Sequence, residues 1–591
     1  MNASTQHDFK VTETSFRHQH SCDVLVIGSG AGGLSSAVSA ATQDLDVIVA
    51  EKATVFGGTT AVSGGWLWIP NTPHAQKAGQ AEPIQRPKQY LKNVLGDQYD
   101  EQKIHTYLTK APEMIDFFEK STDVKFNIGS AVPDFYDIEG SRVGWRSIVA
   151  APFDGRELGE NLHLLKPAIP ETTVWGMGIA SGVDMKHFIN TFKSVFSFTY
   201  ATKRVIRHFI DLLFRHRSTQ IVNGNALVAR LLKSALDQKV KLYANHAATQ
   251  LVFEQERVVG AIFKTPEGLV KIMAKHGVVL ATGGFPHDEE RKKQLFKHVA
   301  LGTPHYSAAP ETNTGDGLKL AESVGASVCH DLPWSGAWAP VSLIPRLDGT
   351  LGRFPHLVER GKPGLIAVLP NGKRFTNEGD SYPAFVKDLL KHTAEGALAR
   401  CWLICDHKFI QRYGLGAVKP FPISMQPWIE NGYLKQADSL EALAQKCGIS
   451  TASFVNTLTN YNRHAVNGED PEFHRGSTPY QKTQGDTIQQ PNPCIAPIQK
   501  GPFYAVQIVP GSLGTFAGLK TDCEARVLNQ DTNLPIKGLY AVGNDMNSIM
   551  GGQYPSGGIT LGPAMTFGFI VGQQFGQEAR LSSRLQKMDG K

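Results

Sequence analysis

Short apolar runs near the start of the chain alternate with glycine-rich turns and helix-compatible segments. Residues 23–27 (DVLVI) predict a strand, residues 34–41 (LSSAVSAA) predict a helix, and residues 46–50 (DVIVA) predict a second strand. Strand, helix and strand in this order, joined by short turns, predict a βαβ unit. The chain is therefore expected to open with an α/β fold.

Helical and strand patterns also alternate along the rest of the chain, which contains no internal repeat and no low-complexity tract. The spacing of Val228, Leu231, Leu232 and Leu236 predicts a helix over 226–237, and a β-rich stretch follows at 240–262. Strands running into glycine turns are expected at 278–281 and 538–542, and helical patterns appear at 383–398 and 438–445. Residues 470–500, rich in Pro, Gln and Gly, are expected to form a long return connection.

One segment, 193–217, concentrates positive charge. It contains six Lys/Arg (193, 203, 204, 207, 215 and 217) against the single acid Asp211. Apolar residues at Val205, Phe209, Leu212 and Leu213 predict a helix with one hydrophobic side. Two interpretations stay open: a surface helix packed on a domain, or an interfacial helix resting on an anionic membrane.

The composition is that of a globular protein, with 591 residues of which 41% are hydrophobic and 19% charged. A net charge of +6 is small for this length and does not indicate nucleic-acid binding. Seven scattered cysteines without CxxC pairs favour a reducing compartment over a disulfide framework or a metal site. Residues 1–20 are polar and are expected to form a loose tail rather than a signal peptide, and no transmembrane run is present in the sequence. The Cys401/Cys405 pair is expected to share a helix face in the core.

The first turn carries a dinucleotide-binding fingerprint, GSGAGG over 28–33. Gly28 permits the tight turn, Gly30 lets the backbone approach a pyrophosphate, and Gly33 lets helix and strand pack closely. The helix N-terminus offers unpaired N–H groups to the phosphates, and Glu51 at the second strand end can bond ribose hydroxyls. A second Gly/Ser/Thr-rich loop follows Glu51, and two further glycine turns lie far downstream, an arrangement typical of flavoproteins. The expected cofactor contacts are Gly28, Gly30, Ala31, Gly32, Gly33, Glu51, Lys52, Gly58, Thr59, Thr60, Ser63, Gly64, Ala281, Thr282, Gly283, Gly543, Asn544, Gly558 and Leu561.

These motifs together resemble the 3-ketosteroid Δ1-dehydrogenase family of FAD-dependent flavoproteins, which is related to fumarate reductases. The resemblance spans about residues 21–575 and rests on DVLVIGSGAGG, EKATVFGGTTAVSGGWLWIPN, PDFYDIEGSRVGWRS, NGKRFTNEGDSY and GLYAVGNDMNSIMGGQYPSGGITLGPAMTFG. It implies an α/β architecture with a Rossmann-like, discontinuous FAD-binding domain and an inserted α+β catalytic domain. We expect the tail at 1–20, the FAD domain at 21–290 and 498–591, and the catalytic domain at 291–497.

The resemblance also implies tyrosine chemistry. The loop ending in Tyr382 maps to the one that carries the family's catalytic base, which removes the C2 proton while hydride passes from the steroid to FAD. Tyr136, in PDFY, maps to a tyrosine that supports the base, whereas Phe135 lacks a hydroxyl and can only wall the pocket. Tyr554 and the N–H of Gly558 map to the pair that holds the C3 carbonyl oxygen, an oxyanion hole for the enolate.

Several alternatives stay open. Ser556 follows Tyr554 by two residues, as in ketosteroid Δ4(5α)-dehydrogenases, so the position of desaturation is less secure than the reaction type. A fumarate-type reductase and a non-catalytic flavoprotein are the other candidates. FAD is expected to be non-covalent, the acceptor to be a quinone or a soluble carrier, no metal or nucleic acid is expected, and the location is expected to be cytoplasmic, with peripheral membrane contact through 193–217.

Overall fold

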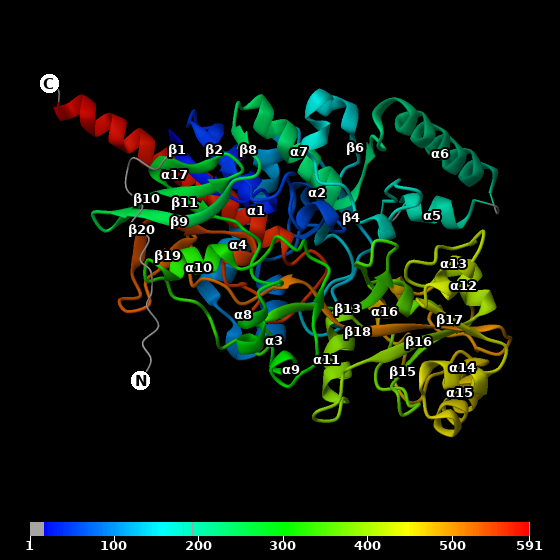
Figure 1. The fold of residues 1–591 in the computed structure, drawn as a ribbon. Coiled ribbons are helices and arrows are strands. Elements are labelled where there is room, and N and C mark those ends of the chain that lie inside the picture. Colours follow the sequence, from blue (N-terminus) through cyan, green and yellow to red (C-terminus); the bar gives the residue numbers. More distant parts are fainter. Residues whose placement is uncertain (1–16, 181–182, 192–193, 590–591) are drawn as a thin grey trace.

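The computed structural model describes residues 17–180, 183–191 and 194–589 (Figure 1). Most of the expected tail, 1–16, and Lys193 of the basic segment lie outside the described residues. Strand β1 (His18–Ile27) already begins at His18, so the last three residues of the expected tail belong to a strand. The tail prediction is wrong for those three residues because His18 to Cys22 pair with strand β11.

The first sheet gathers strands from both ends of the chain. Strand β1 lies between β2 (Val47–Ala50) and β11 (Gly268–Leu280), and the three run parallel. Strand β8 (Lys241–Tyr243) extends the sheet beyond β2, and β20 (Pro535–Ala541) runs parallel to β11. Since β20 lies more than two hundred residues after β11, this first sheet is built from two distant parts of the chain, as expected of a discontinuous domain.

Helices cover this sheet, and its central strands are apolar throughout their length. Helix α1 (Ala31–Ala41) packs between α17 (Leu561–Asp589) and α7 (Asn223–Asp237). All eleven residues of α1 are buried, and residues 24–27 of β1 are at most 4% exposed, which is the pattern of a parallel strand covered on both faces. The opening βαβ unit predicted from the sequence is confirmed.

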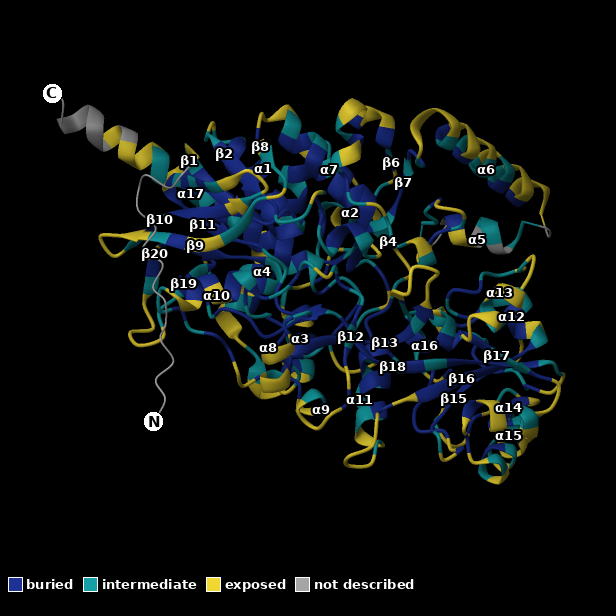
Figure 2. Ribbon diagram, in the orientation of Figure 1, coloured by how far each residue is buried: buried dark blue, intermediate teal, exposed yellow. Residues whose placement is uncertain are grey.

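A second sheet is built around the long strand β18 (Phe503–Thr515). Its neighbours are β13 (Gly336–Pro345), β16 (Cys401–Asp406), β17 (Leu434–Ala437) and β12 (Tyr306–Ser307), and the sheet ends in β14 (Leu351–Pro355) and β15 (Leu365–Val368). Leu365 and Ala367 face one apolar cluster while Ile366 and Val368 face another, so both sides of this sheet are covered as well. Figure 2 shows buried residues along the strands of both sheets.

The position of strand β18 moves the expected boundary at which the chain returns to the first sheet. The boundary expected at residue 498 would assign β18 to the FAD domain, but every strand paired with β18 belongs to the second sheet. We therefore propose that the return begins after Thr515.

Three other expectations are corrected. Helix α11 (Tyr382–Lys391) ends seven residues before the expected end at 398. The connection at 470–500 is not continuous coil, because it contains helix α16 (Pro479–Gln484). Cys401 and Cys405 lie on strand β16 rather than on a helix; both are fully buried, consistent with the expected core role.

The remaining elements complete the layers in Figure 1. Additional strands are β3 (Trp66–Trp68), β4 (Phe126–Gly129), β5 (Ser147–Ala150), β6 (Phe153–Asp154), β7 (Gln220–Ile221), β9 (Ala247–Glu254), β10 (Arg257–Thr265) and β19 (Arg526–Leu528). Additional helices are α2 (Pro73–Lys77), α3 (Gln85–Leu95), α4 (Glu101–Ser121), α5 (Val183–Ile189), α6 (Val195–Arg215), α8 (Glu289–Leu295), α9 (Lys297–Ala300), α10 (Asp316–Glu322), α12 (His407–Tyr413), α13 (Gln426–Glu430), α14 (Leu440–Cys447) and α15 (Thr451–Ala465).

Candidate active site

A single large cavity runs from the glycine turn after β1 to the helices of the second sheet. Its volume is about 1310 Å³. Single small-molecule sites usually enclose roughly 300–1,000 Å³, so this cavity has room for a dinucleotide and a second ligand. One end is lined by the turns after β1, β11 and β20, and the other by residues near α11 and α16.

The cavity brings together nearly all of the expected cofactor residues. Those that line it are Gly28, Gly30, Ala31, Gly32, Glu51, Lys52, Gly58, Thr59, Thr60, Ser63, Gly64, Ala281, Thr282, Gly283, Gly543, Asn544, Gly558 and Leu561. Gly33 is the exception. A Cβ there would stand 2.0 Å from the Gly28 oxygen, so Gly33 has the expected role of helix–strand packing but is not a cofactor contact.

Glu51 is aimed at the glycine turn by its own hydrogen bonds. Its Oε2 accepts from the N–H of Ser29 at 3.1 Å and from the Ser29 hydroxyl at 2.6 Å, and its Oε1 accepts from the N–H of Ala53 at 2.9 Å. The carboxylate is 8% exposed and lines the cavity. It therefore stands at the second strand end where a ribose hydroxyl can reach it.

Asp545 joins two of the cofactor turns and was missed in the sequence. Its carboxylate accepts from the N–H of Thr282 at 2.5 Å, from the Thr282 hydroxyl at 2.9 Å and from the N–H of Gly284 at 2.9 Å. Burial raises the pKa of Asp545 to about 6, against the lowering effect of these donors. The aspartate thus locks the turn after β11 to the turn after β20, two segments that the sequence separates by 263 positions.

The bare backbone of several glycines fits a dinucleotide. A Cβ at Gly30 or Gly58 would have nothing nearer than 3.6 Å, and one at Gly557 would have nothing within 4 Å, although all three positions line the cavity. Such open backbone beside the N-terminus of α1 can approach a pyrophosphate closely. The residues present therefore fit FAD.

Aromatic rings meet at the other end of the cavity. The rings of Tyr382 and Tyr554 lie edge to face with centroids 5.0 Å apart. Phe135 contacts Tyr382 at 5.5 Å, stacks on Tyr554 at 5.7 Å and lies 4.6 Å from Tyr480. All four residues line the cavity, and they come from four separate segments of the chain.

Burial dominates the acidity of these phenols. It raises the pKa of Tyr382 well above its usual value, with Tyr554 and Tyr480 acting in the same direction and the Arg360 guanidinium opposing them. Burial also raises the pKa of Tyr554, to about 12, while its interaction with Tyr382 lowers it. Tyr382 is therefore protonated at neutral pH, and Arg360 is the positive group that favours its ionisation.

Tyr136 does not itself line the cavity, and its support of Tyr382 stays a prediction. Its neighbour Phe135 lines the cavity, as expected of a wall residue, and the N–H of Phe135 donates to the Pro555 oxygen at 3.0 Å. The aromatic partner near Tyr382 that the sequence reading missed is Tyr480, the second residue of α16. No periodic signal marks Tyr480, because it lies in a Pro/Gln-rich stretch.

Gly558 is required by the packing of its own backbone. Its φ is +100°, and a Cβ would stand 2.7 Å from the backbone of Leu67 and Trp68. The Gly558 oxygen accepts from the N–H of Trp68 at 3.1 Å. Close packing on β3 therefore excludes a side chain at 558, and it fixes the Gly558 backbone at the cavity wall.

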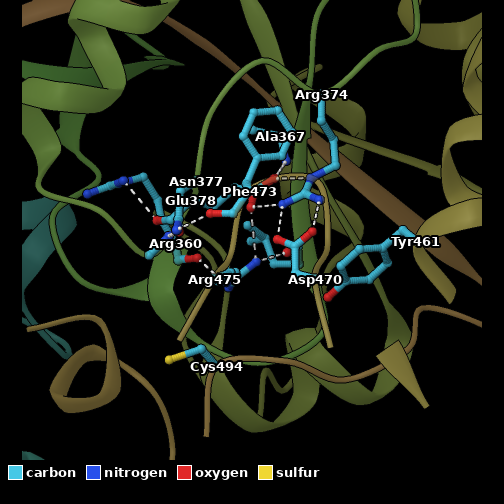
Figure 3. A network of polar contacts seen from close by, with 12 residues as sticks. Arg360, Ala367, Arg374, Asn377, Glu378, Tyr461, Asp470, Phe473, Arg475 and Cys494 are labelled. Atoms are coloured by element: carbon cyan, nitrogen blue, oxygen red, sulfur yellow. Dashed lines mark hydrogen bonds and ion pairs between the residues drawn. The ribbon is translucent and has the colours of Figure 1, made fainter. Parts of the chain in front are cut away.

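A buried charge network holds the loop that leads to Tyr382 (Figure 3). Arg374 donates to Glu378 at 2.9 and 2.7 Å and to Asp470 at 2.8 Å through two nitrogens. Arg475 contacts Glu378 at 3.3 Å. All four side chains are at most 2% exposed, so each charge depends on its partners.

Arg360 extends this network towards the tyrosines. It donates to the backbone carbonyl oxygen of Glu378 at 3.0 Å and to that of Asp380, two residues before Tyr382, at 3.2 Å. The guanidinium also lies over the Phe385 ring, 5.0 Å from its centroid. One buried arginine thus both shapes the loop and supplies a positive field behind Tyr382.

Comparisons with known proteins agree with this geometry. The model of the FAD binding domain family matches residues 23–561. The 4-oxocyclohex-2-ene-1-carboxylate 5-dehydrogenase of Sinomonas cyclohexanicum is 38% identical, over 95% of this chain and 94% of its own. The 3-oxosteroid 1-dehydrogenase of Mycolicibacterium smegmatis is 34% identical, over 95% and 98%.

A solved structure is similar throughout. The 3-ketosteroid Δ1-dehydrogenase from Sterolibacterium denitrificans, in complex with 1,4-androstadiene-3,17-dione, superposes with a TM-score of 0.86 at 32% identity, covering 95% of this chain and 100% of that chain. The chain therefore belongs to the FAD-binding flavoenzyme family that contains the 3-oxosteroid 1-dehydrogenases, and it is an FAD-dependent oxidoreductase.

Proposed function

We propose that the protein desaturates C1–C2 of a 3-ketosteroid. The observation that carries this proposal is the meeting of Tyr382, Tyr554 and the Gly558 backbone on one cavity that also receives the FAD-binding turns. The Tyr554 hydroxyl and the Gly558 N–H can donate to one ketone oxygen, and Tyr382 can remove a proton from the neighbouring carbon.

Each residue then has a defined task. Tyr382 takes the C2 proton, and Arg360 favours the phenolate that this requires. The Tyr554 hydroxyl and the Gly558 N–H donate to the C3 oxygen as negative charge develops there. FAD, when bound, supplies the acceptor for the hydride that leaves C1. Phe135 and Tyr480 exclude water from this end of the cavity.

Two of the alternatives receive less support. The wall contains Tyr554, Gly557 and Gly558, but Ser556 is fully buried and does not line it, which disfavours a Δ4(5α) enzyme that uses this serine. Among the described residues that line the cavity there is no arginine, whereas a reductase of unsaturated diacids needs cations for two carboxylates.

A smaller, carboxylated cyclic ketone is the second candidate substrate. It is favoured by Lys362, which lines the cavity with Thr483 and Gln484 of α16. The Lys362 Nζ donates to the Gly485 oxygen at 2.7 Å, and burial lowers its pKa. An ammonium in this position can hold a substrate carboxylate, such as the one named for the Sinomonas relative.

The other lysines on the cavity wall suit this task less well. Lys52 forms an ion pair with Asp316 at 2.8 Å, and Lys166 interacts with Glu51 at the cofactor end. Lys362 is thus the lysine that belongs to the tyrosine end.

Lys362→Met separates the two substrates. If the substrate is a carboxylated cyclohexanone, loss of a charge-assisted bond costs about 1.5–3 kcal/mol, and KM rises by roughly 10- to 100-fold. If the substrate is a neutral 3-ketosteroid, KM changes less than about threefold by the same reasoning. Activity of the unmodified enzyme on androst-4-ene-3,17-dione and on 4-oxocyclohexanecarboxylate should be compared in parallel.

The catalytic proposal is tested by Tyr382→Phe. The variant should retain FAD, but anaerobic addition of a 3-ketosteroid should no longer bleach the flavin absorbance at a useful rate, because general-base contributions are about 10²–10⁴-fold. Retained turnover shows that Tyr382 is not the base. No bleaching of the unmodified enzyme by any cyclic ketone identifies a non-catalytic flavoprotein. Product analysis with a 5α-saturated steroid distinguishes Δ1 from Δ4 desaturation.

We also infer that FAD is held without a covalent bond, that a quinone or a soluble carrier reoxidises it, and that the enzyme works in the cytoplasm, in contact with a membrane surface. Its seven cysteines are all free, which supports a reducing compartment. Acid precipitation should release all of the flavin into the supernatant.

A further inference from the structure

Helix α6 turns its apolar side away from the protein. The helix lies at the outer edge of the molecule, and Figure 2 shows exposed residues along it. Phe196, Leu213 and Phe214 are 71%, 73% and 76% exposed. The exposed apolar face consists of Val195, Phe196, Phe198, Ile206, Phe209, Ile210, Leu213 and Phe214.

The polar side of the same helix packs inward. Its buried residues are Ser197, Ala201, His208 and Asp211. Arg204 forms an ion pair with Asp184 of α5, and Asp211 accepts from the N–H and the hydroxyl of Thr219 at 2.8 and 2.7 Å. The helix therefore packs on the protein through its polar side, while Phe209 and Leu213 of the predicted hydrophobic side are exposed.

This arrangement is the reverse of an ordinary surface helix, which buries its apolar stripe. On α6, large aliphatic and aromatic residues instead recur from Val195 to Phe214 on the side that faces away from the protein. Trp175 continues the same surface, since its ring lies 6.1 Å from that of Phe209 and it is 60% exposed. A contiguous apolar surface of this kind marks an interaction site.

We propose that the apolar face of α6, together with Trp175, inserts into the interfacial layer of a lipid bilayer with anionic headgroups. Charge complementarity selects this partner: the exposed Lys203 and Arg215 flank the apolar face, while Asp211, the one acidic residue of the helix, is buried. A tryptophan beside aliphatic residues and cations is the composition that suits the headgroup boundary. In the described ranges, none of the helices has the length and hydropathy that a bilayer span requires.

The position of α6 beside the active-site cavity links the lipid contact to substrate entry, an argument that rests on the proposed function. Tyr200 of α6 and Asp184 and Met185 of α5 line the active-site cavity, and Met185 is also 45% exposed. The cavity therefore reaches the surface beside the proposed lipid contact. A water-insoluble cyclic ketone dissolved in the bilayer can enter there without crossing water.

Co-sedimentation of the full-length holoenzyme tests the contact without any substrate, so its outcome is independent of the proposed reaction. Vesicles of equimolar phosphatidylglycerol and phosphatidylcholine should pull down the enzyme at low salt, with weaker binding in pure phosphatidylcholine or at high salt. The variant Ile206→Ser/Ile210→Ser/Leu213→Ser should lose at least about tenfold in vesicle affinity. Because these side chains are exposed, it should keep its flavin and its melting temperature.

A matched control uses exposed leucines on other parts of the fold. Leu301, Leu398 and Leu534 are 51%, 58% and 65% exposed, and the triple Leu→Ser variant at these positions should bind vesicles like the unmodified enzyme. Equal losses in both variants would overturn the proposal, as would absence of binding to anionic vesicles at low salt. A concentration-dependent dimer that only the α6 variant dissociates, measured by analytical ultracentrifugation, would assign this surface to a second copy and also overturn it.

Discussion

Removal of the Tyr554 hydroxyl should slow flavin reduction while leaving the cavity intact. Tyr554 is 3% exposed, and its ring is fixed by Phe135, Tyr382 and Phe516 at centroid distances of 5.7, 5.0 and 5.8 Å. Phenylalanine keeps all three ring contacts. The substitution Tyr554→Phe therefore isolates the hydroxyl from the packing of the ring.

The size of the effect follows from the number of donors on the ketone oxygen. With the hydroxyl gone, the Gly558 N–H is the donor that remains in the proposed pair. Loss of one oxyanion donor costs about 2.7–4 kcal/mol, which corresponds to a roughly 10²–10³-fold slower reduction of FAD. The pKa of Tyr382 should fall in this variant, because Tyr554 is one of the groups that raise it. The rise of the rate with pH, which reports deprotonation of Tyr382, should therefore begin at lower pH although the maximal rate falls.

The assay is anaerobic stopped-flow absorbance of the flavin with a 3-ketosteroid, repeated across the pH range. Tyr461→Phe is the matched control, since that hydroxyl is also buried and donates to the Ala496 oxygen at 3.1 Å, away from the cavity. A loss below about tenfold would refute the role of Tyr554 in holding the oxygen. A large loss without any shift of the pH profile would refute the proposed coupling between the two phenols.

The remaining predictions concern the base, the charge network and the cofactor turn. Because burial raises the pKa of Tyr382 and the base must be deprotonated, the rate of flavin reduction at subsaturating substrate should rise about tenfold per pH unit towards pH 10; a plateau below pH 8 would contradict this. Glu378→Gln leaves Arg374 and Arg475 underpaired in the interior and should cost about 3–5 kcal/mol of stability, measured as a fall in the melting temperature. Glu472 is 60% exposed and lies 3.7 Å from Arg374, so Glu472→Gln should change the melting temperature little. Equal effects of the two variants would refute the role of the network. Gly33→Ala places a Cβ 2.0 Å from the Gly28 oxygen and should yield protein without bound FAD, measured as the ratio of absorbance at 450 and 280 nm; a full flavin content would show that α1 can move away from β1.

Local chemistry made the opening of the fold and much of the site predictable from the sequence. The turn 28–33 and the strands beside it follow from glycine spacing and apolar runs, which depend on neighbours along the chain. Leu561 begins α17 with Pro563 in the first turn, as the position of the proline predicts. The family motifs predict that Tyr382 and Tyr554 share one site, and the structure places their rings in contact.

The misses have a common physical cause, since each depends on long-range packing. Tyr480 of α16 reaches Phe135 and Tyr382 only through the tertiary fold, so no local spacing could identify it. The i, i+4 spacing of Cys401 and Cys405 places both on one face of a strand as well as of a helix, so it could not decide between them. Periodicity likewise identifies the two sides of α6 but not which of them meets the protein.

The four aromatic residues at the tyrosine end come from segments around positions 135, 382, 480 and 554. A nascent chain that has not yet emerged beyond Tyr554 lacks part of this constellation, however well its earlier strands have formed. Turnover is thus a stringent reporter of completed tertiary assembly. Separately expressed halves should be inert, and their recovery of activity on mixing would measure docking of one half on the other.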